Sequence, residues 1–313
     1  MPEARQLHQD QALTNLSLKY RNEAMIWPNI MPLVKVQHRS DKYYVYNKQD
    51  SYQLPDDKIG PKSYANEYDW GVATQNYSVR DHALADWVTV EEIENADNPL
   101  APEVDSNEFL NLLLDIAQES RVATKVFTSG NYAAGNTVTL SGTSQWGQSA
   151  DDPIGSLLTA IETCFLRANT IVMGVDVWLI FRKLPEILDA VKGSTRYQTQ
   201  GPGGLATVDE VKGLFEVDNW YIGRGRYNTA KPGQTSTYAR LWGKHVAALH
   251  IEPEPSVKTV TFGVTFAEML RATYTEFDGK RGIKGANYIK VAWNSDEEII
   301  ANDLGYMIVN AVP

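Results

Sequence analysis

The stretch DSNEFLNLLLDIAQESRVATKVFT, residues 105–128, decides the fold. Its apolar residues recur every three or four positions, which predicts a helix with one apolar side. They are Phe109, Leu112, Leu113, Ile116, Ala117, Val122 or Ala123, and Val126 or Phe127. Asp105 and Glu108 resemble a capping box with Asp in place of Ser or Thr, and they predict where the helix begins. At roughly 1.5 Å per residue, about six turns give a rod on the order of 35 Å, which can be the backbone of a flattened molecule.

Residues 1–40, upstream of this helix, predict an extended arm. Pro28 and Pro32 interrupt the segment IWPNIMPLVKV, and each biases the residue before it toward extended backbone. Apolar side chains are scattered along the arm: Leu13, Leu16, Leu18, Ile26, Trp27, Ile30, Leu33 and Val34. An arm with this much apolar surface must bury it, and another subunit is one place to do so.

Residues 41–90 predict a long two-stranded β-ribbon. The run from Tyr43 to Tyr46 is aromatic and β-branched. A turn-rich middle at 54–61 contains Leu-Pro-Asp-Asp and Gly-Pro, and from Tyr64 to Val79 apolar and polar residues approximately alternate. Because a two-stranded ribbon is marginally stable alone, we expect its polar tip to be exposed unless a partner covers it.

The chain beyond the long helix predicts a linker, a mixed α/β lobe and a closing β section. The linker, 129–152, is rich in Gly, Ser, Thr and Asn, with a strand candidate at 138–140. The lobe predicts a helix capped by Asp152 that runs from Pro153 to about Ala168, a strand at 170–173, a helix capped by Asp176 through Leu184, its restart from Pro185 to Gly193, a helix with a Thr207–Glu210 capping box ending near Phe215, and strands at 220–222 and 246–249. The closing section predicts strands at 259–266, 271–277, 286–293 and 304–311.

Composition indicates a folded protein of one large or two modest domains, with 313 residues, 43% hydrophobic and 22% charged. The net charge of −10 makes the chain a poor candidate for a dedicated DNA-binding protein, which needs clustered Lys and Arg. From Asp81 to Glu119 there are 11 carboxylates and no Lys or Arg, whereas the first fifty residues carry seven Lys and Arg. This acidic run fits either a solvated face or one of two complementary surfaces that meet between neighbouring subunits.

The termini and the one cysteine exclude several classes of protein. Cys164 is the single cysteine, so no intrachain disulfide can form, and its apolar neighbours predict a buried small side chain. The opening MPEARQLHQDQALTNL has no apolar core and is not a signal peptide. No stretch approaches 18 apolar residues, so we expect no membrane span.

A search for chemical motifs predicts no catalytic, cofactor or metal site. GPGGLA at 201–206 matches G-x-G-x-x-A, but no strand precedes it, so we interpret it as a loop. P-loop and nucleophile-elbow motifs are absent. The five histidines are dispersed, and His245 and His250 are five apart on an expected strand, so they would face opposite sides. Gly223-Arg224-Gly225-Arg226 is a small basic spot, and the 16 Tyr and 8 Trp suit packing and interfaces.

The order of arm, ribbon, long helix, α/β lobe and β section resembles the major capsid fold of tailed bacteriophages, shared with encapsulin shells and the herpesvirus capsid floor. The amino-acid sequence also resembles that of one phage major capsid protein family over nearly its whole length. The similar stretches are LTNLSLKYRNEAMIWPNIMPLVKVQHRSDKYYVYNKQD, ENADNPL (94–100), YAAGNTVTLSGTSQWGQSADDPI (132–154), VMGVDVWLIFRKLPEIL, VKGLFEVDNWYIGRGRYNTAK, LWGKHVAALHIEP and ANDLGYMIVNAV.

The resemblance implies an α+β fold divided into four parts. These are an N-terminal arm (1–40), an extended loop that lies over a neighbour as a β-ribbon (41–90), a peripheral domain with the long helix as its spine (91–150 and 251–313), and an axial α/β domain whose loops meet at five-fold and six-fold axes (151–250). It also implies candidate subunit-interface residues: Trp27, Ile30, Tyr44, Tyr46, Lys58, Tyr64, Trp70, Arg224 and Arg226.

The function implied by the resemblance is that of a phage head protein. Pentamers and hexamers would form an icosahedral shell around double-stranded DNA, assembled in the bacterial cytoplasm and ending in the virion. The implied partners are other copies of the chain, a separate scaffolding protein, a portal protein, a cement or decoration protein, and packaged DNA without sequence-specific contacts; no membrane is implied.

Two features depart from the pattern of some relatives, and two alternative functions stay open. Relatives with a cleaved helical scaffolding region carry it before the arm, whereas this chain begins almost at the arm with Met1, which favours a separate scaffold. Lys48, Lys58 and Lys62 lie in the ribbon, but no motif identifies them as partners in Lys–Asn cross-links.

The two alternative functions are an encapsulin-type shell around enzyme cargo and a cytosolic α/β enzyme built on residues 151–250.

Overall fold

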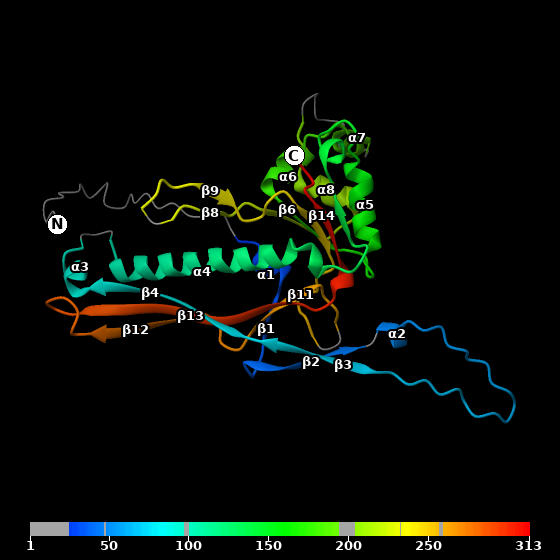
Figure 1. The fold of residues 1–313 in the computed structure, drawn as a ribbon, viewed down its shortest axis with the longest axis horizontal. Helices are drawn as coiled ribbons and strands as arrows, with labels where there is room; N and C mark the ends of the chain where they lie inside the picture. Colours follow the sequence, from blue (N-terminus) through cyan, green and yellow to red (C-terminus); the bar gives the residue numbers. More distant parts are fainter. Residues whose placement is uncertain (1–24, 47, 97–99, 194–203, 232, 257–258) are drawn as a thin grey trace.

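The computed structural model describes residues 25–46, 48–96, 100–193, 204–231, 233–256 and 259–313. Figure 1 shows an elongated α+β molecule in which a long helix lies along a sheet, a lobe stands at one end of that helix, and a ribbon projects past the lobe.

Helices and strands alternate irregularly along the chain. The helices are α1 (Trp27–Ile30), α2 (Lys48–Ser51), α3 (Val90–Glu94), α4 (Pro102–Val126), α5 (Pro153–Thr163), α6 (Val175–Phe181), α7 (Pro185–Gly193) and α8 (Val208–Phe215), with short 3-10 turns η2 (Ser129–Asn131), η3 (Gly142–Ser144) and η4 (Asn302–Leu304). The strands are β1 (Leu33–Lys35), β2 (Ser40–Tyr46), β3 (Val72–Ser78), β4 (Arg80–Thr89), β5 (Thr137–Thr139), β6 (Thr170–Gly174), β7 (Asn219–Gly223), β8 (Arg226–Asn228), β9 (Tyr238–Arg240), β10 (Val246–Leu249), β11 (Gly263–Ala267), β12 (Ala272–Asp278), β13 (Ala286–Ile299) and β14 (Gly305–Val309).

The predicted long helix is confirmed as α4, and it packs on a sheet whose central strand is β13. β13 pairs antiparallel with β4, β12 and β11. Leu110 and Leu114 of α4 are buried against a cluster from β4 and β13, which includes Val88, Ile289 and Val291. Phe109 is 54% exposed. The buried side of α4 runs through Leu110, Leu114, Gln118 and Val122, so the apolar side predicted from Phe109, Leu112, Leu113, Ile116 and Ala117 is wrong over the first half of the helix.

The start of α4 differs from the prediction. The residue that caps the helix is Ala101, with Pro102 at the first helical position, and Asp105 already lies in the first turn. One carboxylate oxygen of Asp105 accepts a hydrogen bond from the Ala101 backbone N–H at 3.3 Å. The predicted Asp105–Glu108 capping box is therefore wrong. Proline sets the start instead, because its fixed φ suits this position and its missing N–H is not needed there.

The described part of the arm is folded into its own chain. β1 pairs parallel with β11, and Trp27 and Ile30 of α1 are 9% and 0% exposed. The ring centroid of Trp27 lies 5.8 Å from that of Trp293. The prediction that Trp27 and Ile30 lie at a subunit interface is therefore wrong: α4 and the sheet already bury both side chains. The predicted arm from 1 to 24 lies outside the described residues.

The predicted ribbon is confirmed over β2 and β3, which pair antiparallel from Ser40–Ser78 to Tyr46–Val72. The prediction that it extends to residue 90 is wrong, because the chain leaves the ribbon at Val79 and continues as β4 in the large sheet. Val79 is 7% exposed and packs with Val264 and Phe266. Burial of this side chain therefore fixes the crossing point between the two sheets.

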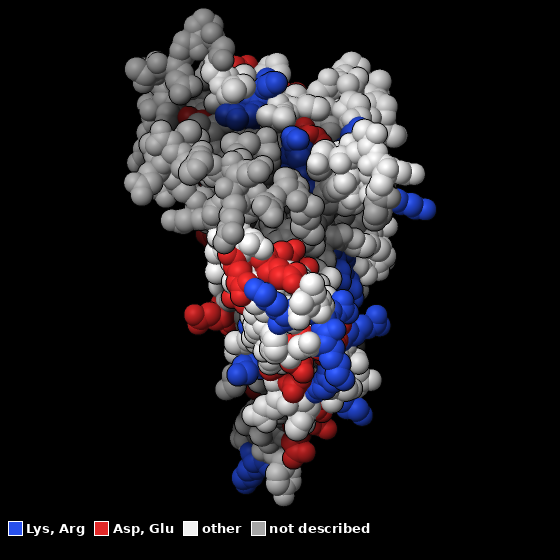
Figure 2. Space-filling view, turned by 90° about the vertical axis from the view of Figure 1, so that its left-hand side faces the viewer, with Lys and Arg blue, Asp and Glu red and all other residues white. Residues whose placement is uncertain are grey.

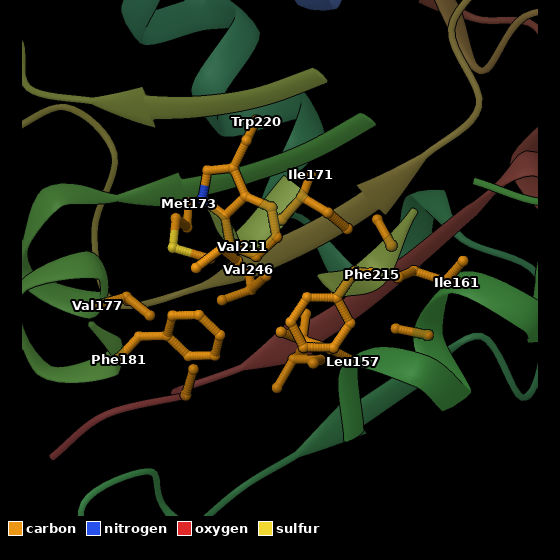
Figure 3. Packing of buried hydrophobic residues seen from close by; sticks show 14 of the residues in the cluster. Leu157, Ile161, Ile171, Met173, Val177, Phe181, Val211, Phe215, Trp220 and Val246 are labelled. Atoms are coloured by element: carbon orange, nitrogen blue, oxygen red, sulfur yellow. The ribbon is translucent and has the colours of Figure 1, made fainter. Parts of the chain in front are cut away.

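The lobe is built on a five-stranded sheet of order β5-β14-β10-β6-β7, accompanied by α5 to α8. Figure 3 shows Leu157, Phe181, Phe215 and Trp220 converging in its core. The predicted caps at Asp152 and at Thr207 with Glu210 are confirmed. The burial of these apolar side chains holds α5 to α8 against the lobe sheet.

Two helix boundaries and the placement of one strand in the lobe differ from the predictions. α5 ends at Thr163 and not near Ala168, and α6 is capped by Gly174, which places Asp176 in its first turn. The resemblance places residues 251–313 in the peripheral domain, but the last strand, β14, pairs with β10 and β5 in the lobe sheet. Tyr306 and Ile308 of β14 belong to the lobe core, and the burial of these two side chains is the physical reason why β14 joins the lobe sheet. Met307 on the other side of β14 packs in the cluster that contains Val122 and Val126 of α4.

Candidate assembly surfaces

The far end of the ribbon, residues 48–71, is called the ribbon tip here, and it carries apolar side chains that its own chain does not cover. Leu54 is 94% exposed and Tyr64 is 96% exposed. Hydrogen bonds close the tip from within: the Asp56 backbone N–H donates to the Tyr68 hydroxyl at 2.7 Å, and the Asn66 side-chain amide donates to the Asp56 carbonyl at 2.6 Å. The tip thus has a defined shape with its apolar groups on the outside.

The base of the ribbon tip contacts the lobe. The ring of Tyr52 meets that of Phe165 edge-on, with centroids 4.8 Å apart. Lys48 Nζ lies 3.5 Å from the centroid of the same Phe165 ring and forms an ion pair with Asp303. These contacts fix the direction in which the ribbon leaves the molecule (Figure 1).

The other predicted ribbon candidates are also on the surface where the structure describes them. Tyr44 is 68% exposed, Trp70 is 65% exposed, and Lys58 is exposed. Tyr46 pairs with Val72 at the end of β2, and its side chain lies outside the described part of the chain. The exposure of Tyr44 and Trp70 is compatible with an interface role, which stays a prediction.

Arg224 and Arg226 lie at the base of the β8–β9 hairpin, which pairs only with itself among the described strands. Both side chains are exposed, and the Arg224 carbonyl accepts a hydrogen bond from Arg240 at 3.0 Å. Residues 219–251, which include the hairpin, contain no Asp or Glu. Figure 1 shows the hairpin reaching out from the lobe.

Several carboxylates of the acidic run from Asp81 to Glu119 form ion pairs within their own chain. Asp115 pairs with Arg271 at 2.7 Å, and Asp81 and Glu94 pair with Arg39 and Lys284. These intrachain pairs fit neither a purely solvated face nor a surface kept wholly for a neighbour. The contact of the remaining carboxylates with another subunit stays a prediction.

Glu119 is a buried carboxylate where the arm, α4 and the segment before β10 meet. Its side chain is 1% exposed. It accepts hydrogen bonds from the backbone N–H groups of Ile26 (3.1 Å) and Trp27 (2.9 Å) and from the indole N–H of Trp242. Burial raises the pKa of Glu119. The hydrogen bonds from the three donors lower it in part, and the nearby carboxylate of Asp115 raises it further. The carboxylate therefore ties three segments distant in sequence to one point.

The raised pKa of Glu119 predicts a pH dependence of stability. The folded chain takes up a proton here at a higher pH than the unfolded chain, so this contribution is complete below the unfolded-state pKa and is lost as pH rises through the folded-state pKa. Glu119→Gln lacks the ionisation. In urea denaturation from about pH 4 to pH 8, its deficit relative to wild type should therefore be largest at the acidic end. A deficit that grows with pH would contradict this assignment.

Other groups that could carry chemistry serve structural roles. The prediction that Cys164 is buried is confirmed, and burial raises the pKa of its thiol to about 12. His245 and His250 flank β10 and do not lie on it; the Nδ1 of His245 accepts from the Asn310 backbone N–H at 3.0 Å. Within the described ranges no cluster of three or more His, Cys, Asp or Glu side chains could hold a metal ion. None of the helices seen there combines the length and apolar character needed to cross a bilayer.

Several important residues were not identified from the sequence. Glu119 lies three residues before Val122 on the buried side of the helix. A carboxylate on a buried side is rare unless it is paired, and this was the signal that could have identified Glu119. Ile283, 92% exposed between two glycines in the β12–β13 turn, was likewise missed.

The comparisons with known proteins agree with this architecture. No protein-family model matches the chain. The chain is 31% identical over 304 residues to a major capsid protein of Pseudomonas phage JBD67, covering 97% of both chains. It is 25% identical over 247 residues to the major capsid protein of Burkholderia phage BcepMu, covering 77% of this chain and 76% of that one.

Solved structures show the same fold. A phage-related protein of Bordetella bronchiseptica superposes with a TM-score of 0.68 at 21% identity over 94% of this chain and 95% of that one. An encapsulin from Synechococcus elongatus gives 0.52 at 11% identity over 97% of both chains, which shows a shared fold and not a shared cargo. Because the likeness to a capsid protein spans nearly the full length of both sequences, the chain belongs to the family of phage major capsid proteins.

Proposed function

We propose that copies of this chain form the pentamers and hexamers of an icosahedral phage head, and that the ribbon tip of each copy lies over its neighbour. One observation carries the role of the tip: it keeps a defined shape while Leu54 and Tyr64 remain almost fully exposed. Large exposed apolar side chains are unfavourable in a monomer and are typical of a surface that a partner covers.

The rest of the proposal follows from family membership and from the kind of residues present. The chain acts as a structural protein and not as an enzyme. It encloses double-stranded DNA without reading its sequence, assembles in the host cytoplasm with a separate scaffolding protein and a portal protein, and accepts a cement or decoration protein on the finished head. The net charge of −10 supports weak contact with packaged DNA, since like charges repel.

The experiment tests the ribbon tip with the double variant Leu54→Asp/Tyr64→Asp. We expect the variant to keep the circular dichroism and urea midpoint of the unassembled wild type, because neither side chain is buried. We expect shell yield, measured by sedimentation and electron microscopy, to fall at least tenfold, because each carboxylate would be placed in an apolar contact.

Leu54→Met/Tyr64→Phe is the matched control and should assemble as wild type does. Normal shells from the aspartate variant would disprove the role of the tip. A wild-type chain that forms no shells, alone or with a scaffolding protein, would disprove the shell function itself.

A further inference from the structure

The β12–β13 turn, residues 279–285, lies at the end of the molecule remote from the lobe, next to α3 and the start of α4 (Figure 1). Three contacts fix this arrangement: the Val90 backbone N–H donates to the Gly285 carbonyl at 3.1 Å, Asn287 donates to Glu103 at 2.6 Å, and Lys284 pairs with Glu94. The turn and the first turn of α4 therefore share one end surface.

The turn presents an apolar tip surrounded by cations. Ile283 is 92% exposed, and Phe277, at the end of β12, is 59% exposed. The turn has the sequence GKRGIKG, with three cations and no carboxylate, and Lys280, Arg281 and Lys284 are all exposed. An isoleucine held out in this way gains nothing within its own chain, so its free energy is lowered only when another surface covers it.

The neighbouring start of α4 has the opposite charge and its own exposed apolar side chains. Leu100, which precedes the N-cap residue Ala101, is 62% exposed, and Val104, in the first turn of α4, is 57% exposed. Glu103 lies between them, exposed, and residues 89–108 contain no Lys or Arg. Figure 2, which looks onto this end, shows carboxylates and cations gathered in adjacent patches.

We propose that the β12–β13 turn of one copy docks on the start of α4 of a second copy, with Ile283 against Leu100 and Val104 and the cations of the turn facing the carboxylates of α3 and α4. The chain's own carboxylates hold the turn in place but leave Ile283 uncovered, so the complementary surface must come from outside. Because both halves of the contact lie on the same end, copies that meet end to end around a rotation axis each give a turn to one neighbour and a helix to the next.

This inference rests on the shell function proposed above and names a second contact, separate from the ribbon tip. A different protein seated on the turn is the competing occupant. Its signature would be a turn that is dispensable for shells and is not close to α4 of any copy.

The first test compares Ile283→Asp with the conservative control Ile283→Val. Both variants should fold as wild type does, since the side chain is 92% exposed, and circular dichroism checks this. We expect Ile283→Asp to lower the yield of closed shells at least tenfold, while small oligomers held by the ribbon tip persist in sedimentation. Wild-type yield from Ile283→Asp would overturn the inference and leave the shell function intact, whereas absence of shells from wild type would overturn the shell function.

The second test locates the contact directly. In assembled particles of the double variant Ile283→Cys/Val104→Cys, mild oxidation should give disulfide-linked multimers on a non-reducing gel, and neither single variant should give them. The native Cys164 is buried and does not interfere. Monomers alone from the oxidised double variant would overturn the proposed geometry.

Discussion

Gly174→Ala is expected to lower the free energy of unfolding by about 4 kcal/mol, because the added methyl group would collide with backbone. A Cβ at this position would lie 2.0 Å from the carbonyl oxygens of both Trp242 and Gly243. Gly174 is the register partner of Gly223 across β6 and β7, and a Cβ on Gly223 would meet the Trp242 side chain at 2.1 Å. The two glycines thus form the slot in which the Trp242 segment crosses the sheet.

Urea denaturation of the unassembled chain, followed by tryptophan fluorescence, would measure this loss, and the melting temperature should fall by roughly 6 °C in a chain of 313 residues. Gly213→Ala is the matched control, since nothing lies within 4 Å of its Cβ position in α8. There the same change should stabilise the chain by about 0.5–1 kcal/mol, because alanine favours a helix interior. Equal effects of the two substitutions would contradict the steric explanation.

Glu119→Leu is expected to lower the free energy of unfolding by about 3–5 kcal/mol, because it leaves two buried donors and one partly buried donor without an acceptor. These are the backbone N–H groups of Ile26 and Trp27 and the indole N–H of Trp242. Each unsatisfied donor costs about 1–3 kcal/mol, and the favourable burial of leucine offsets part of the sum.

The same denaturation experiment separates this effect from the loss of a charge. Glu119→Gln keeps one carbonyl oxygen as an acceptor and should lose clearly less stability than Glu119→Leu at neutral pH. Glu67→Leu, in the exposed ribbon tip, should change stability by less than about 0.5 kcal/mol. If Glu119→Leu were as stable as wild type, Glu119 would not be the point that joins the arm to α4 and the lobe.

The two positions are parts of one arrangement around Trp242. Gly174 and Gly223 let this residue approach the sheet, and Glu119 accepts its indole N–H. A substitution at either end therefore loosens both the lobe and the attachment of α1. In a shell, such loosening would change the angle at which the ribbon tip and the β12–β13 turn meet neighbouring copies, since both segments extend from the part of the chain that this arrangement holds together.

Local sequence patterns were sufficient to predict an element where residues close in sequence stabilise it. The spacing of apolar residues predicted α4, and the capping boxes and prolines predicted α5 and α8, because helix signals act within one or two turns. The aromatic run at 43–46 predicted the first strand of the ribbon for the same kind of reason.

The sequence by itself thus determined the α+β class, the long helix, the exposed ribbon and, through its ordered resemblance, the capsid fold. Tertiary structure alone decided which sheet β14 joins, that Trp27 and Ile30 are buried in their own chain, and that Glu119 gathers three distant segments. These outcomes depend on burial and hydrogen bonding between residues that are tens to hundreds of positions apart. Periodicity and capping carry no information about such pairs, so only the folded chain specifies them.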